Sequence, residues 1–145
     1  MGRTGLRIRA SRGHRDVRAV VIPFARWLRQ TRPFPIRVPV YLCRRPHVVT
    51  VDGRRASASF FAPWDTRVEP YIRVATGDFE ALRRRWGRNG ATVSYLISLA
   101  HEVLHYEQWV QGRALSERGV PRRAGAMVKR YLEAPRNGAN GDEAA

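Results

Sequence analysis

The five residues His101-Glu102-Val103-Leu104-His105 restrict the fold of this chain more than any other feature. On an α-helix, residues i and i+4 lie on one face, so both imidazoles can point at one metal ion. Residues 91–100 are almost all apolar or small, which predicts that this helix is buried. Buried imidazoles and a buried carboxylate need a partner, and a divalent metal is one. The alternative is two histidines that lie at the surface or are satisfied within the core, on an ordinary helix.

The same spacing, H-E-x-x-H, is the zinc-peptidase motif. Its two histidines are zinc ligands, and the glutamate between them is placed to polarise a water molecule. We therefore take His101 and His105 as candidate zinc ligands and Glu102 as the candidate general base. The helix that carries them is expected over about 89–111, with Gly112 after its end.

Hydrophobic spacing predicts two further long elements and a short one. A first helix is expected over about 16–30, capped by Asp16 and either kinked or started late at Pro23. Asp78 can cap a short helix that ends at Gly87 or Gly90. A closing helix is expected within 116–133, with Pro121 in its first turn.

Four runs rich in Val, Ile, Phe and Tyr predict short strands between these helices. Pro39 lacks a backbone N–H, so its run suits an edge or a bulge better than a central strand. The runs are 36–43, 47–51, 57–62 and 71–75.

The order of elements indicates an α+β fold: an N-terminal helix, a small mixed sheet of three to four strands, the long H-E-x-x-H helix and a closing helix. We expect one domain over 15–135. Residues 1–14 are rich in arginine and glycine and are expected to be flexible. Residues 136–145 are expected to be a disordered tail.

Composition bears on location and partners. Cys43 is the one cysteine, so no intrachain disulfide forms. The N-terminus has no apolar segment typical of a secretory signal, and no stretch reaches the length of a membrane span. We therefore expect a cytoplasmic protein without a membrane partner. The sequence leaves its oligomeric state open.

The net charge of +15 allows nucleic acid as a partner. We do not favour it from the sequence, because the arginines are spread along the whole chain instead of forming one block. Only Lys129 among the 27 basic residues is a lysine, a bias that often reflects a GC-rich genome. A solvated basic surface is the simpler interpretation.

The run Leu99-Ala100-His101-Glu102-Val103-Leu104-His105-Tyr106-Glu107-Gln108-Trp109 resembles the active-site helices of zincin metallopeptidases of minimal size, namely minigluzincins, IrrE-type peptidases and SprT-like proteins. The resemblance covers roughly residues 16–133, but only the five-residue motif is specific. It implies a zinc-dependent peptidase that takes a peptide or protein substrate. It also implies an edge strand that pairs with the bound peptide, for which 71–74 is the candidate.

The third ligand departs from some of these families. No histidine follows His105, which argues against the SprT-like set, and Arg123 stands where IrrE-type helices carry a carboxylate. We prefer Glu117 as the third ligand, because it is the nearest downstream acid beyond Glu107, which faces away from the imidazoles. A surface acid at a helix end is its alternative role. The remaining ligand candidates are Glu133, Asp65, Glu69 and His47.

Two alternatives to a zinc peptidase remain from the sequence. One is a catalytically silent domain that keeps the fold and binds metal or a partner. The other is a DNA-associated protease of the SprT-like kind. For a peptidase, an oxyanion donor is also needed, and Tyr131, Tyr106 or an arginine could supply it.

Overall fold

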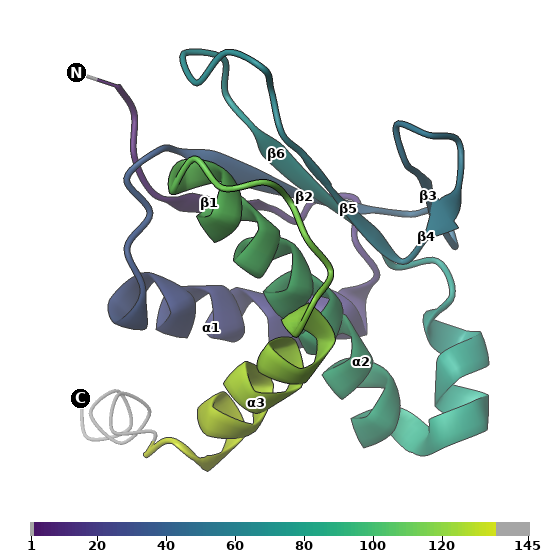
Figure 1. The fold of residues 1–145 in the computed structure, drawn as a ribbon. Helices are drawn as coiled ribbons and strands as arrows, with labels where there is room; N and C mark the ends of the chain where they lie inside the picture. Colours follow the sequence, from purple (N-terminus) through teal and green to yellow (C-terminus); the bar gives the residue numbers. More distant parts are fainter. Residues whose placement is uncertain (1, 136–145) are drawn as a thin grey trace.

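The computed structural model describes residues 2–135. It confirms an α+β fold: a four-stranded mixed sheet and a separate two-stranded sheet accompany three helices (Figure 1). The predicted tail, 136–145, lies outside the described residues. Within the described part, no helix has the length and apolar character needed to cross a membrane.

The elements follow one another along the chain as follows: β1 (Leu6–Arg9), α1 (Arg15–Thr31), β2 (Val38–Cys43), β3 (Val48–Val49), β4 (Arg55–Ala56), β5 (Ala58–Phe61), β6 (Tyr71–Ala75), α2 (Phe79–Val110) and α3 (Val120–Glu133).

The main sheet has the strand order β1-β2-β6-β5. β1, β2 and β6 are parallel, and β5 is antiparallel to β6 at the edge. The prediction that Tyr71–Val74 forms the edge is therefore wrong. After β5 the chain turns back and forms β6, which pairs with β5 on one side and with β2 on the other. β6 therefore lies inside the sheet.

The prediction that residues 1–14 are flexible is wrong for Leu6–Arg9, which form β1. Leu6 is fully buried and Ile8 packs against the core, whereas Arg7 and Arg9 are exposed. This alternation is the two-residue period of a strand with one buried face. β1 is only four residues long and is flanked by arginines and glycines, so the sequence pattern did not indicate a strand here.

β2 is an inner strand in spite of Pro39. The N–H of Val38 donates to Gly5 on the β1 side, and pairing with β6 begins at Val40 and Ile72. Along a strand, successive N–H groups point to opposite sides. The missing N–H of Pro39 therefore falls just before the first pair of the β2–β6 ladder, where no bond is lost.

The run expected over 47–51 does not join the main sheet. β3 pairs with β4 as a short antiparallel hairpin of its own. The tip of this hairpin, 50–54, projects from the end of the main sheet (Figure 1).

α1 begins after His14, whose Nδ1 accepts from the N–H of Asp16 at 3.1 Å, so the cap is His14 and not Asp16. Pro23 lies inside this helix. α2 contains both helices expected from the sequence, joined at Gly87, whose φ of 75° and ψ of 170° are not helical. Pro121 lies in the first turn of α3, as predicted.

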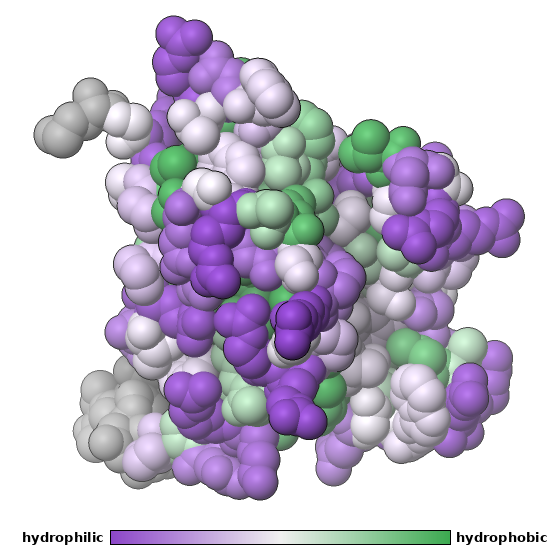
Figure 2. All heavy atoms as spheres, viewed as in Figure 1, coloured by the Kyte–Doolittle hydropathy of each residue, from purple (hydrophilic) through white to green (hydrophobic). Residues whose placement is uncertain are grey.

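All three helices lie on one side of the main sheet (Figure 1). α1 and the second part of α2 contact the sheet, and α3 packs on α2. Apolar residues of these elements form one core, which includes Phe24, Ile72, Leu99 and Met127. From the helix side, hydrophilic residues dominate the surface and apolar residues form small separate patches (Figure 2). The core thus holds α2 firmly against β5 and β6.

Candidate metal centre

The second half of α2 places His101 and His105 one turn apart. Their Nε2 atoms are 3.2 Å from each other. The His105 side chain is 8% exposed and that of His101 is 25% exposed, so the pair lies at the boundary between the core and solvent. Apolar neighbours such as Leu99, Ala100 and Val103 keep this part of the helix buried. The helix geometry expected from the sequence is therefore present.

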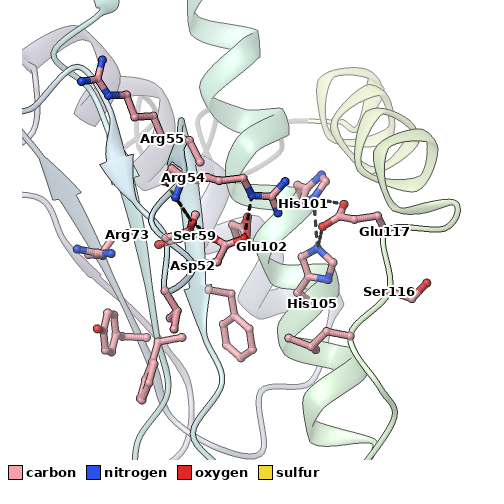
Figure 3. A pocket seen from close by; sticks show the side chains of 18 residues that line it. Asp52, Arg54, Arg55, Ser59, Arg73, His101, Glu102, His105, Ser116 and Glu117 are labelled. Carbon is pink, nitrogen blue, oxygen red and sulfur yellow. Dashed lines mark hydrogen bonds and ion pairs between the residues drawn. The ribbon is translucent and has the colours of Figure 1, made fainter.

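Glu117 reaches the two imidazoles from the loop between α2 and α3 (Figure 3). Its Oε2 is 2.9 Å from Nε2 of His101, and its Oε1 is 2.7 Å from Nε2 of His105. Within residues 2–135, His101, His105 and Glu117 form the group whose ligand atoms could hold a metal ion.

The other carboxylates considered from the sequence are not part of this group. Asp65 pairs with Arg67, and Glu69 pairs with Arg37. Glu133 is the last residue of α3.

The donor set fits a zinc ion. The three ligand atoms lie within 4.8 Å of one another. For tetrahedral zinc with bonds of about 2.0–2.1 Å, neighbouring ligand atoms are about 3.3–3.4 Å apart. The separations observed here are slightly shorter, and Glu117 is 70% exposed and free to shift outward. Two imidazoles and one carboxylate leave a fourth position open, which is typical of a catalytic site.

Gln108 connects His105 to the loop that carries Glu117. Its Oε1 lies 2.9 Å from Nδ1 of His105 and also accepts from the N–H of Ser116 at 3.1 Å. Its Nε2 donates to the carbonyl of Ser116 at 3.0 Å. Gln108 is buried, so these bonds are shielded from water.

This role of Gln108 was not predicted from the sequence. The available signal was its position three residues after His105, on the same side of the helix. A partner on Nδ1 fixes which ring nitrogen is free to bind a metal. Gln108 therefore orients one candidate ligand and holds the residue next to another.

Glu102 is 8% exposed and lines the same cavity as the two imidazoles. Burial raises the pKa of its carboxyl to about 7; Glu117 also raises this pKa and His105 lowers it. For His101 the largest effect is also burial, which lowers the pKa of an imidazole. Glu117 raises the pKa of His101, and His105 lowers it. The His101 shift favours the neutral imidazole that a metal needs.

The group opens into a cavity of about 660 Å³ between α2, β5 and the β3–β4 hairpin. All four residues of the edge strand β5, 58–61, line it. In Figure 3, Arg54 on the hairpin extends across this cavity toward His101, whereas Arg55 points away. Nε of Arg54 also donates to Asp52 at 2.9 Å, and both side chains are exposed.

The two tyrosines expected as oxyanion donors lie elsewhere. Tyr131 packs against Phe24 and Trp27 in the core. The hydroxyl of Tyr106 donates to the carbonyl of Ile36 and accepts from its N–H. Neither tyrosine lines the cavity, so an arginine remains the candidate for this role.

Searches of family models, curated proteins and solved structures found no match to this chain.

Proposed function

We propose that this protein is a zinc-dependent peptidase. The observation that carries the proposal is the convergence of His101, His105 and Glu117 at one point, with the buried Glu102 in the same cavity. Three residues from two separate segments supply a ligand set with one open position. The single free cysteine, Cys43, is in keeping with the cytoplasmic location that we propose for it.

In this proposal His101, His105 and Glu117 hold the ion. Bound zinc would supply a Lewis acid that polarises a substrate carbonyl and lowers the pKa of water. Glu102 accepts a proton from the attacking water and passes it to the leaving amine. Burial raises the pKa of this carboxyl above its ordinary value, which favours the uptake and release of a proton near neutral pH.

β5 supports a peptide as the substrate. It is one of the two edge strands of the main sheet, it runs antiparallel to β6, and it borders the cavity that contains the candidate ligands. An exposed edge offers main-chain donors and acceptors to an extended peptide. A peptide paired with β5 would pass beside His101 and Glu102. Arg54, which extends across the cavity, is our candidate for the oxyanion donor.

The replacement Glu102→Gln tests the proposal. It preserves the size of the side chain and leaves all three candidate ligands in place, so zinc binding should persist. Hydrolysis of casein or of a peptide library should fall by at least about 100-fold, because the proton acceptor is lost. Zinc content is measured by elemental analysis of the same samples.

The double variant His101→Ala/His105→Ala is the control for the metal and should purify without zinc. If wild type binds zinc but hydrolyses nothing, the catalytically silent domain replaces the peptidase. If the double variant keeps its zinc, the metal site itself is misassigned.

A further inference from the structure

A second cavity, of about 780 Å³, lies at the carboxyl ends of β1 and β2 and extends along β3. Five arginines and one histidine line it, none of the candidate metal ligands does, and Arg73 is shared with the cavity of the candidate metal centre. The basic residues are Arg9, Arg12, Arg44, Arg45, Arg73 and His47. No aspartate or glutamate occurs among its lining residues, all of which lie in the described part of the chain. We call it the basic cavity.

The charges of this cavity are not neutralised within the protein. Elsewhere on the surface, arginines such as Arg32, Arg67 and Arg83 form ion pairs with carboxylates. Over residues 2–135, none of the five arginines of the basic cavity does so. Nε of Arg73 is buried and has no hydrogen-bond partner. Such a concentration of one charge attracts an anionic ligand with several charges.

The strand register explains why the arginines meet a tyrosine here. Arg9 pairs with Tyr41, Tyr41 pairs with Arg73, and Arg73 pairs with Ser59. Directly opposed residues share a face of the sheet, so these side chains form one row across four strands. This is the face opposite the helices, and Tyr41 is 42% exposed on it.

The next row of this face continues the aromatic surface. Tyr41 contacts Tyr71 edge-on, with ring centroids 6.1 Å apart, and Tyr71 stacks on Phe61 at 5.0 Å. The guanidinium of Arg73 lies 6.0 Å from the centre of the Tyr71 ring. Tyr41 is the exposed ring of this surface, and Tyr71 and Phe61 are half-buried beside it. An exposed ring among arginines is suited to an unpaired base and phosphates together.

We propose that this uncovered sheet face binds single-stranded nucleic acid, with phosphates at the arginines of the basic cavity and a base on Tyr41. An acidic peptide matches the charge but makes no use of the exposed ring. A duplex presents phosphates, but its bases are already stacked inside the helix. Arg73 lines both cavities, and Phe61 and Tyr71 line the cavity of the candidate metal centre. The inference does not rest on the proposed peptidase activity, because no candidate metal ligand lines the basic cavity.

Binding of a fluorescent single-stranded oligonucleotide of about ten nucleotides tests the inference, with anisotropy recorded at several salt concentrations. Each phosphate contact contributes about −0.7 to the slope of log K against log salt for a single strand. If all five arginines contact phosphates, the slope is about −3.5. Arg44→Glu/Arg45→Glu should remove about two contacts, so the slope should become less steep, about −2.

The matched control is Arg122→Glu/Arg123→Glu. Both arginines are exposed on α3, away from the basic cavity, and the change in net charge is the same. This variant should bind nearly as well as wild type. If both double variants lose affinity equally, binding reflects net charge alone and the inference is wrong.

Tyr41→Ala separates base contact from charge. Affinity should fall about 5- to 100-fold with an unchanged salt slope, because stacking is lost and the phosphate contacts remain. Tyr41→Phe should restore it. If duplex DNA, or polyglutamate of the same charge, competes as well as the unlabelled single-stranded oligonucleotide, the inference is wrong. His101→Ala/His105→Ala should keep its affinity, so failure of the metal site and failure of this site are told apart.

Discussion

At the scale of single residues, the candidate metal centre depends on how one loop residue is held. Glu117 is 70% exposed and belongs to no helix or strand. Its neighbour Ser116 makes two hydrogen bonds to Gln108, which also contacts His105. The precision of the site therefore comes from a buried side chain that is itself no candidate ligand.

Glu117→Gln should weaken zinc binding by at least about tenfold, because a neutral amide is a poorer ligand for zinc than a carboxylate. Competition with a chelator of known affinity measures the change. Glu133→Gln is the matched control, since Glu133 was the next candidate in the sequence and ends α3. Equal zinc affinity of wild type and Glu117→Gln would exclude Glu117 as a ligand.

Gln108→Ala should lower zinc affinity about 10- to 100-fold, the range typical of residues that orient a metal-binding histidine. In the metal-free protein, the NMR signal of the Ser116 amide should also lose its protection from exchange, because its acceptor is removed. Gln111→Ala, an exposed change at the end of the same helix, should alter neither quantity. A protected Ser116 amide in Gln108→Ala would contradict the role of Gln108.

At the scale of elements, the break in α2 separates a short outer helix from the helix that carries the site. Gly87 has φ 75° and ψ 170°, a conformation that is essentially restricted to glycine. The hydroxyl of Tyr95 donates to Asp78, which ties the outer helix back to the inner one. The inner helix can therefore follow the sheet while the outer one turns away from it (Figure 1).

Gly87→Ala should lower the free energy of unfolding by about 1–3 kcal/mol, because alanine is strained in this conformation. Steric overlap is not the reason, since an added Cβ meets no atom within 4 Å. Gly125→Ala is the matched control: it also adds a methyl group in open space, but within the helix α3. It should raise stability by about 0.5–1 kcal/mol. Urea denaturation measures both, and equal effects would contradict the argument.

At the scale of the whole molecule, the metal should connect two parts of the fold. His101 and His105 lie on α2, and Glu117 lies in the connection to α3. An ion that binds only the folded state adds its binding free energy to the stability of the protein. It also restrains the approach of α3 to α2.

Removal of zinc with a chelator should therefore lower the Tm. At a free zinc concentration of 100 times Kd, the stabilisation is about 2.7 kcal/mol. For a chain of this length, this corresponds to a shift of about 5–10 °C. Scanning calorimetry with and without chelator measures it. The Tm of His101→Ala/His105→Ala should not respond to the chelator, and a response would show that the stabilising metal binds elsewhere.

Features that depend on neighbouring residues could be predicted from the sequence. The helix that carries His101, Glu102 and His105 follows from local spacing. Its separation from the outer helix was predicted at Gly87 or Gly90, and the structure has it at Gly87. Pro121 marked the start of α3 for the same reason. These predictions succeeded because the backbone of a helix places residues three and four apart on one side wherever the helix lies in the fold.

Pairing between distant segments was decided by the tertiary structure. Leu6 and Ile8 form β1 only because β2 pairs with this segment and the core buries their side chains. β6 lies inside the sheet because β2 and β5 pair with its two sides, which leaves β5 at one edge. Glu117 could be named by elimination, but its approach to the imidazoles depends on Gln108 and Ser116. The arginines of the basic cavity come from two strands and two loops, which is why they looked scattered along the chain. The burial of apolar faces sets these long-range arrangements, and no local pattern records them.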